Sequence, residues 1–177
     1  NSSDLDNKKN LIAKLEYRPV PNFRLSASGQ LGYGTAVATS LYNNTVALGE
    51  TYKQNRYAVG AEWKSKLTGN DYHNHRCIMV RAEMLGGKDG GCKSSGAYIS
   101  TAIPVYKGLD IVAMADYMNY NTDLDLTKTN LMAGIQYWIF KKCRLQAQYT
   151  YSLRNDAMKA LQGDNTSMIQ TQIQVAF

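Results

Sequence analysis

The 177-residue chain has few of the residues on which enzymes, metal centres and disulfide frameworks depend. It contains only two histidines, which leaves little for acid–base chemistry. No Ser/His/Asp or Cys/His set has a persuasive spacing. The three cysteines, Cys77, Cys92 and Cys143, are odd in number and share no metal-ligand spacing. We therefore expect no catalysis, cofactor, metal or disulfide framework, although a single Cys77–Cys143 pair stays open.

Long apolar runs and clustered charges are also absent. Hydrophobic residues make up 44% of the chain, yet no run approaches the roughly 18 apolar residues of a membrane helix. The net charge is +6, but the basic residues are scattered singly and form no stripe for nucleic acid. These absences leave β-proteins open, including membrane β-barrels, whose half-apolar strands average out as hydrophilic.

The clearest feature present is the alternation of the last ten residues, 168–177. Phe177, Val175, Ile173, Thr171 and Ile169 share one face of a strand, and glutamines dominate the other. Bacterial outer-membrane barrels close with such a strand, apolar toward lipid and polar toward the lumen. We expect this strand, ending at Phe177, to be the element that the barrel-assembly machinery binds.

Similar alternation covers most of the chain, in segments of about ten residues, the length that a tilted membrane strand requires. About nine strands are expected and no convincing helix, within a single domain over 1–177. The 13 tyrosines fit aromatic girdles at the membrane interfaces. Short turns are expected near 19–22, 104–108 and 140–143, and long polar loops at 34–54, 86–95, 120–129 and 154–166. The sorting of short and long connections, which the polar stretch 66–75 breaks, indicates an antiparallel transmembrane β-barrel.

Strand parity gives a further expectation. If Phe177 ends in the periplasm, the strand over 11–18 runs toward the periplasm. Single-chain bacterial barrels have an even number of strands with both ends periplasmic. We therefore expect at least one strand before Asn1, which makes this chain the C-terminal portion of a larger barrel.

The polar face of these strands supplies the candidate functional residues, since charges on a channel wall select ions. Arg18, Arg24, Lys64 and Arg144, opposed mainly by Asp110, would form a basic ring near the short turns that favours anions. The alternative is that the charges pair across strands and keep the lumen wet. The expected channel-lining residues are Lys14, Glu16, Arg18, Arg24, Glu62, Lys64, Arg81, Glu83, Asp110, Asp116, Arg144, Gln146, Gln148, Gln170, Gln172 and Gln174.

Two other patterns are interpreted as ordinary connections. Asp71, His73 and His75 alternate along a polar stretch, but no further metal ligand lies nearby, and a solvated turn is the better interpretation. The run from Gly86 to Gly91 offers backbone donors for phosphate, yet it lacks the Gly-Lys-Ser/Thr context of a phosphate loop. We expect a flexible surface loop there.

Several short stretches resemble the C-terminal half of the phosphate-selective porin O and P family. They are RYAVGAEW (56–63), VRAEM (80–84), GAYIS (96–100), LDIVAMADY (109–117), MAGIQYW (132–138) and the Gln-rich ending. The resemblance covers roughly residues 55–177 and implies a Gram-negative outer-membrane porin with a barrel of about sixteen strands. The Arg expected before Asp116 is absent, which puts phosphate selectivity in doubt.

Together these features predict an outer-membrane porin for passive diffusion of small hydrophilic solutes, anions among them. It would contact outer-membrane lipid and, by analogy, form a homo-oligomer. One alternative is a small non-conducting barrel that serves as an anchor or as part of a surface assembly, with paired charges filling the lumen. Another is a soluble β-sandwich binding module, in which Tyr57, Trp63, Tyr149 and Tyr151 pack between two sheets.

Overall fold

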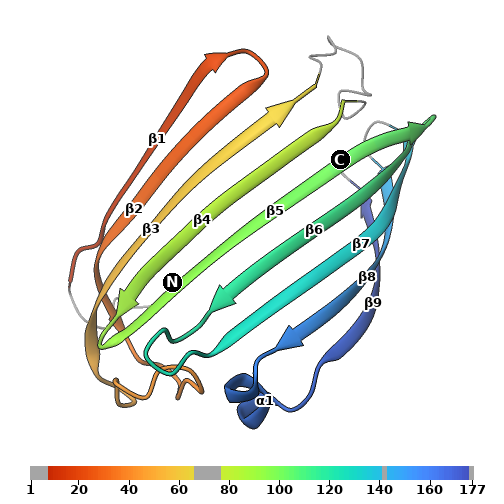
Figure 1. Cartoon of the computed structure of the whole chain (residues 1–177). Coiled ribbons are helices and arrows are strands. Elements are labelled where there is room, and N and C mark those ends of the chain that lie inside the picture. The colour runs from red at the N-terminus through yellow and green to blue at the C-terminus, as the bar shows by residue number, and fades with distance from the viewer. Residues whose placement is uncertain (1–7, 66–76, 141–142, 176–177) are drawn as a thin grey trace.

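The computed structural model describes residues 8–65, 77–140 and 143–175, which form one antiparallel sheet whose strands lie side by side in chain order (Figure 1). The expected all-β fold with nine antiparallel strands is confirmed. The sheet is not closed: β1 and β9 are its two edges. The strands are β1 (Leu11–Val20), β2 (Phe23–Thr35), β3 (Thr51–Lys64), β4 (Met79–Asp89), β5 (Cys92–Tyr106), β6 (Leu109–Asn119), β7 (Thr127–Phe140), β8 (Cys143–Arg154) and β9 (Thr166–Val175).

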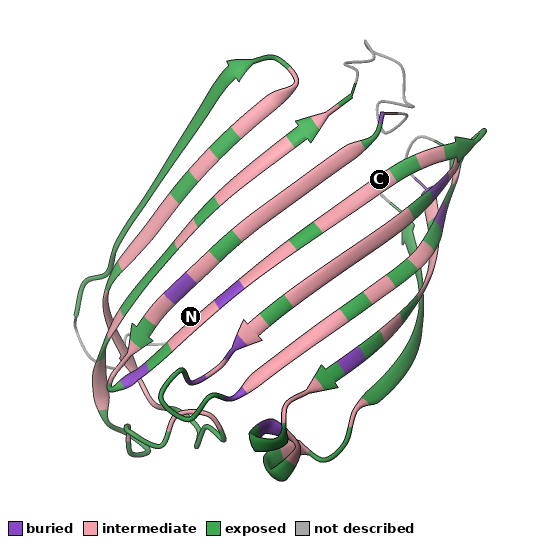
Figure 2. Ribbon diagram, viewed as in Figure 1, coloured by how far each residue is buried: buried purple, intermediate pink, exposed green. Residues whose placement is uncertain are grey.

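The sheet is inside-out by the standards of a soluble protein (Figure 2). On β6 and β7, the apolar side of the sheet carries Ile111 and Ile135, which are 45% and 51% exposed. Asp110 and Gln136, on the other side, are only 1% and 6% exposed. Water would favour the reverse arrangement, whereas a barrel in lipid turns its apolar face outward and encloses its polar face.

This arrangement contradicts the β-sandwich alternative. The described residues form a single sheet, with no second sheet packed against it. The four aromatic side chains expected in a sandwich core are exposed on the apolar face: Tyr57, Trp63, Tyr149 and Tyr151. The strands are 10 to 15 residues long, enough to cross a bilayer at the tilt typical of barrels.

Most connections at the two ends of the sheet differ in length, as the sequence predicts (Figure 1). One end has two-residue turns at 21–22 and 107–108, and the other has the long connections 36–50, 120–126 and 155–165. Two connections break this sorting: residues 65–78 join β3 to β4 at the short-turn end, and the two-residue turn 90–91 lies at the long-loop end.

Register shifts lie near the short-turn end. One of them lets β5 continue past Pro104 to Tyr106, into the range 104–108 where a turn is expected from the sequence. Proline is tolerated there because a bulge needs fewer ladder donors.

The expected loop over 86–95 is wrong. β4 and β5 run almost to their junction, and only Gly90 and Gly91 form the turn. Gly90 has a positive φ of 63°, which glycine adopts without strain. Gly86 and Gly87 belong to β4, where a Cβ at Gly86 would lie 2.7 Å from the hydroxyl oxygen of Tyr57. The glycines here admit close neighbours inside a strand rather than marking a loop.

A short helix, α1 (Asp156–Gln162), lies in the connection between β8 and β9, where no helix is expected from the sequence. The Asn155 side chain caps its start by accepting a hydrogen bond from the Met158 backbone N–H, and Gly163 ends it at a φ of 79°. Met158 is fully buried. Among the described residues, no helix is both long enough and apolar enough to span a membrane.

Candidate functional site

The predicted channel-lining residues lie on the polar side of the sheet, apart from Arg18, which falls within the register shift near the end of β1. The strand register brings them into rows that cross the sheet. Arg24 lies opposite Glu62, and Glu62 opposite Arg81. Farther along the sheet, Gln146 lies opposite Gln172 and Gln148 opposite Gln170. Their role as a channel lining stays a prediction.

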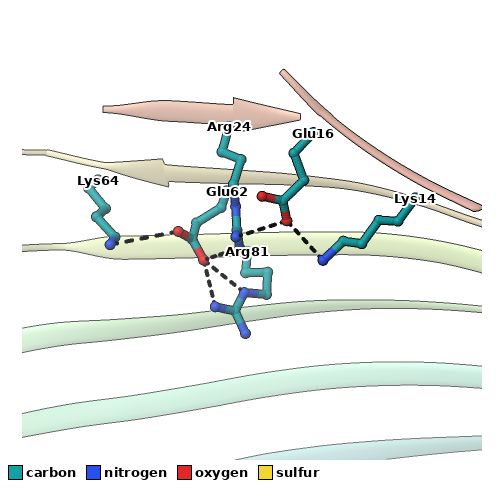
Figure 3. Close-up of polar contacts among 6 residues, drawn as sticks. All are labelled: Lys14, Glu16, Arg24, Glu62, Lys64 and Arg81. Carbon is teal, nitrogen blue, oxygen red and sulfur yellow. Dashed lines mark hydrogen bonds and ion pairs between the residues drawn. The ribbon is translucent and has the colours of Figure 1, made fainter. Parts of the chain in front are cut away.

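Six of these residues form a charge cluster across β1 to β4, drawn in Figure 3: Lys14, Glu16, Arg24, Glu62, Lys64 and Arg81. One Glu62 oxygen accepts hydrogen bonds from Arg24 at 3.1 Å and from Arg81 at 2.5 Å. The other lies 3.7 Å from the Lys64 ammonium. Glu16 pairs with Lys14 at 2.8 Å and with Arg24 at 3.4 Å.

The basic ring expected near the short turns does not form as an unpaired set. Arg24 and Lys64 are ion-paired to Glu62, as the cross-strand alternative predicts. The Glu62 side chain is 12% exposed and is therefore the carboxylate at the centre of the cluster. With four basic and two acidic side chains, the cluster keeps a net positive charge. This section of the wall therefore has most of its charges in ion pairs and a net positive charge.

A second set of polar residues crosses β6 to β9, and we call it the amide relay: Asp110, Gln136, Arg144 and Gln174. Gln136 donates from Nε2 to Asp110 Oδ2 at 2.7 Å, and its Oε1 accepts from Arg144 at 3.1 Å. Arg144 also donates to Gln174 Oε1 at 2.6 Å. Gln136 is not among the residues expected to line the channel, although it alternates with apolar Ile135 and Tyr137 on β7.

The rest of this side of the wall is lined mainly by neutral amides and hydroxyls. Gln146 donates to Gln148 at 2.6 Å, and Gln148 to Gln170 at 2.9 Å. Toward the long loops, Ser152 donates to Asn130, which donates in turn to Asp116 at 2.8 Å. The polar face therefore has an ion-paired half on β1 to β4 and a mainly amide half on β6 to β9.

At the long-loop end, three connections meet at Tyr42, in a group that we call the mouth cluster: Tyr42, Cys92, Tyr120, Asn121 and Gln162. The Tyr42 carbonyl accepts from the Asn121 amide at 2.9 Å and from the Cys92 thiol at 3.7 Å. Its ring stacks on Tyr120 with centroids 4.5 Å apart, and its hydroxyl accepts from Gln162, the last residue of α1. These contacts link residues up to 120 apart in the sequence, so no local sequence pattern reveals them.

The mouth cluster borders a hollow of about 550 Å³ on the polar side. Its wall includes Ser28, Gln30, Arg56 and Asp89, and Arg56 is paired with Asp89 at 2.6 Å. Burial, together with Tyr42 and Asp116, raises the pKa of the Tyr120 hydroxyl further above physiological pH, at which a tyrosine is neutral. The mouth cluster is thus held by uncharged groups.

The structure tests the expectations for the cysteines but not those for the candidate metal ligands. Cys77, Cys92 and Cys143 are buried and form no disulfide, so the Cys77–Cys143 pair is not present. Cys92, expected on a long loop, is the first residue of β5. The Asp71–His75 stretch and Phe177 lie outside the described residues, and the described residues contain no group of acidic, His or Cys side chains suited to a metal.

Comparison with known proteins shows likeness in structure. No protein-family model and no curated protein sequence matches the chain, so membership of the porin O and P family is not supported. Among solved structures, the trimer form of OmpT, an outer membrane protein of Vibrio cholerae, matches 97% of this chain and 55% of its own, at a TM-score of 0.63 and 13% identity. A loop L8 deletion mutant of that protein matches 98% and 55%, at a TM-score of 0.68 and 11% identity.

An anion-selective porin from Comamonas acidovorans is also similar, with a TM-score of 0.65 and 16% identity over 95% of this chain and 49% of that one. The chain thus spans about half the length of these barrels. At such low identity, the likeness establishes the fold, which is that of an outer-membrane β-barrel. The expected outer-membrane location agrees with this fold.

Proposed function

We propose that the protein is a non-enzymatic porin of the Gram-negative outer membrane, through which small hydrophilic solutes, anions among them, diffuse passively. The observation that carries this proposal is the inverted sheet. Exposed apolar side chains on one face suit lipid, and a polar face with Asp110 and Gln136 nearly buried suits an enclosed aqueous lumen. The wall itself would then be the mechanism, with neither a cofactor nor an energy source.

A preference for anions is supported by two basic sites on the wall, the charge cluster and Arg144. The charge cluster carries a net positive charge, and Arg144 adds another cation that contacts neutral amides and no carboxylate within the described residues. Fixed positive charge raises the local concentration of anions. One structural neighbour is described as an anion-selective porin, which is consistent with this preference.

The test is conductance of the protein purified from outer membranes and inserted into planar bilayers. We expect discrete channel openings, and in a KCl gradient a reversal potential on the anion-selective side. Protein that inserts, shown by protease protection in vesicles, but gives no current would contradict the porin proposal.

A non-conducting anchoring barrel is the second candidate, because one observation favours it. Its defining expectation is paired charges across strands, and Glu62 does pair with cations from β2, β3 and β4. The two candidates separate in the same experiment, since an anchor inserts without conducting.

We also propose that these nine strands are the C-terminal portion of a larger closed barrel that forms homo-oligomers. The supports are the open edges at β1 and β9 and the match to about half of each neighbouring barrel. Unpaired backbone groups are costly in lipid, so both edges require strand partners. Lipid on the apolar face and the assembly machinery at β9 would be the other partners.

A further inference from the structure

The hydrogen bonds of the amide relay have a fixed donor-to-acceptor direction, which only one orientation of the Gln136 amide allows. An ionised carboxylate only accepts hydrogen bonds, and a guanidinium only donates them. Gln136 lies between one of each, with its Nε2 2.7 Å from Asp110 Oδ2 and its Oε1 3.1 Å from Arg144 Nη1. Turning the amide over would place like groups together at both ends. Asp110 therefore fixes Gln136, and Gln136 presents an acceptor to Arg144.

Burial stabilises this hydrogen-bond arrangement. Asp110 is 1% exposed and Gln136 is 6% exposed, so water competes poorly for their hydrogen bonds. Asp110 Oδ1 has no hydrogen-bond donor among the described residues, which leaves Gln136 as the group that the carboxylate holds. The relay is buried at Asp110 and becomes accessible at Arg144 and Gln174.

The guanidinium at the accessible end differs from those in the charge cluster. Arg24 and Arg81 donate to Glu62, whereas Arg144 donates to two amide oxygens and lies over the Trp138 ring at 5.4 Å. Amide oxygens and an aromatic face orient a cation without neutralising it. Arg144 consequently keeps its charge available to solutes while its position is fixed.

We propose that Arg144 binds small anions on the channel wall, and that Asp110, acting through Gln136, is the positioning residue that orients its guanidinium. This inference rests on the proposed porin function. It assigns a role to a buried carboxylate which, by charge alone, would repel the solute that it helps to bind.

Two substitutions at Asp110 separate positioning from charge. Asp110→Asn and Asp110→Leu remove the same negative charge, but only Asn retains an oxygen that accepts from Gln136. If Asp110 acts through its charge alone, both variants raise the chloride-to-potassium permeability ratio equally. We expect Asp110→Asn to keep or raise the ratio and Asp110→Leu to lower it. The difference between them should be about threefold, the Boltzmann factor for a unit charge displaced from about 6 Å in water.

Substitutions at the accessible end complete the experiment. Arg144→Gln should lower the ratio by about the same factor, and Arg144→Lys, which keeps the charge but loses the planar fork, should lie between. Adding Asp110→Leu to Arg144→Gln should lower the ratio no further, because the relay then has no guanidinium to orient. Gln136→Leu breaks the relay without touching either charge, and it serves as the test if an Asp110 variant fails to fold.

The outcomes are distinct. Equal reversal potentials for Asp110→Asn and Asp110→Leu, or an unchanged potential in either Gln136→Leu or Arg144→Gln, would overturn the relay while leaving the porin intact. Absence of current in the unmodified protein would instead overturn the porin function on which the relay depends.

Discussion

At the residue scale, Glu62 decides how much positive charge the wall shows. Its carboxylate lies against three cations on three strands, so Glu62→Gln releases Arg24, Lys64 and Arg81 from their shared partner. We expect a reversal potential shifted further toward anions, measured in a KCl gradient. We also expect a loss of about 1–3 kcal/mol in unfolding free energy, because charged donors lose a shielded acceptor. Urea titration in detergent micelles measures that loss.

Glu83 on β4 provides the matched control for this prediction. It has the same charge and lies on the same face, yet within the described residues it has neither an ion pair nor a hydrogen bond. Glu83→Gln should shift selectivity in the same direction with little loss of stability. If both variants lose stability equally, the pairing at Glu62 does not stabilise the sheet.

At the scale of single strands, the two faces of β5 should respond oppositely to the same charge. Ile99 lies near the middle of β5 and is 53% exposed on the apolar face, and Ser100 follows it on the polar face. Ile99→Arg places a guanidinium in lipid and should cost about 2–4 kcal/mol near the bilayer midplane. Ser100→Arg places it in the lumen and should cost far less. Equal losses in a urea titration in vesicles would refute the assignment of faces.

The position of the long connection between β2 and β3 should depend on the Tyr42 side chain. Tyr42→Ala abolishes the stack on Tyr120 and the bond from Gln162 but keeps the backbone carbonyl that Asn121 and Cys92 contact. We therefore expect the connection to loosen at the mouth cluster and single-channel conductance to rise. Tyr42→Phe keeps the ring and should lie closer to the unmodified protein. A conductance that is the same in all three would mean that the mouth cluster does not narrow the channel.

The same cluster should loosen at high pH. The folded structure raises the pKa of Tyr120 above its ordinary value of 10.0, so the neutral hydroxyl is the form that the fold favours. Stability from this group is therefore fully present below pH about 10 and is lost as pH rises through the raised value. We expect the 36–50 connection to be cleaved by protease faster above pH 10 than at neutral pH. In Tyr120→Phe, which has no hydroxyl to ionise, the difference between the two cleavage rates should be smaller.

Elements and residues differ in how far the sequence predicts them. Alternation fixes which side chains share a face, because a strand has a period of two, and so the nine strands and the polar face are foreseen. The run from Gly86 to Gly91 wrongly predicts a loop, because glycines also occur within strands where a neighbouring ring such as that of Tyr57 needs space. The partners of Tyr42 and the Asp110–Gln136 bond are missed, because local pattern carries no information on contacts between distant segments.

At the scale of the whole molecule, strand direction limits how the sheet can close. Eight antiparallel pairings separate β1 from β9, so the two edge strands run in the same direction. Pairing β1 directly with β9, or with β9 of a second copy, would give a parallel pair in an otherwise antiparallel barrel. Bacterial barrels of one chain have an even number of antiparallel strands. An odd number of further strands between the two edges satisfies both conditions.

Cysteine cross-linking in outer membranes tests this closure. A disulfide needs Cα atoms about 4.4–6.8 Å apart. Ala147 and Thr171 are direct partners across β8 and β9, so cysteines at these positions should cross-link and report that oxidation works. Cysteines at Ala13 on β1 and Thr171 on β9 should stay unlinked, because other strands lie between them. The native protein should then have a mass roughly twice the 19.7 kDa of this chain, as expected for barrels of which it spans about half. A link between positions 13 and 171 within one chain would mean that nine strands close on themselves, and a link between two chains would mean that a second copy closes the barrel.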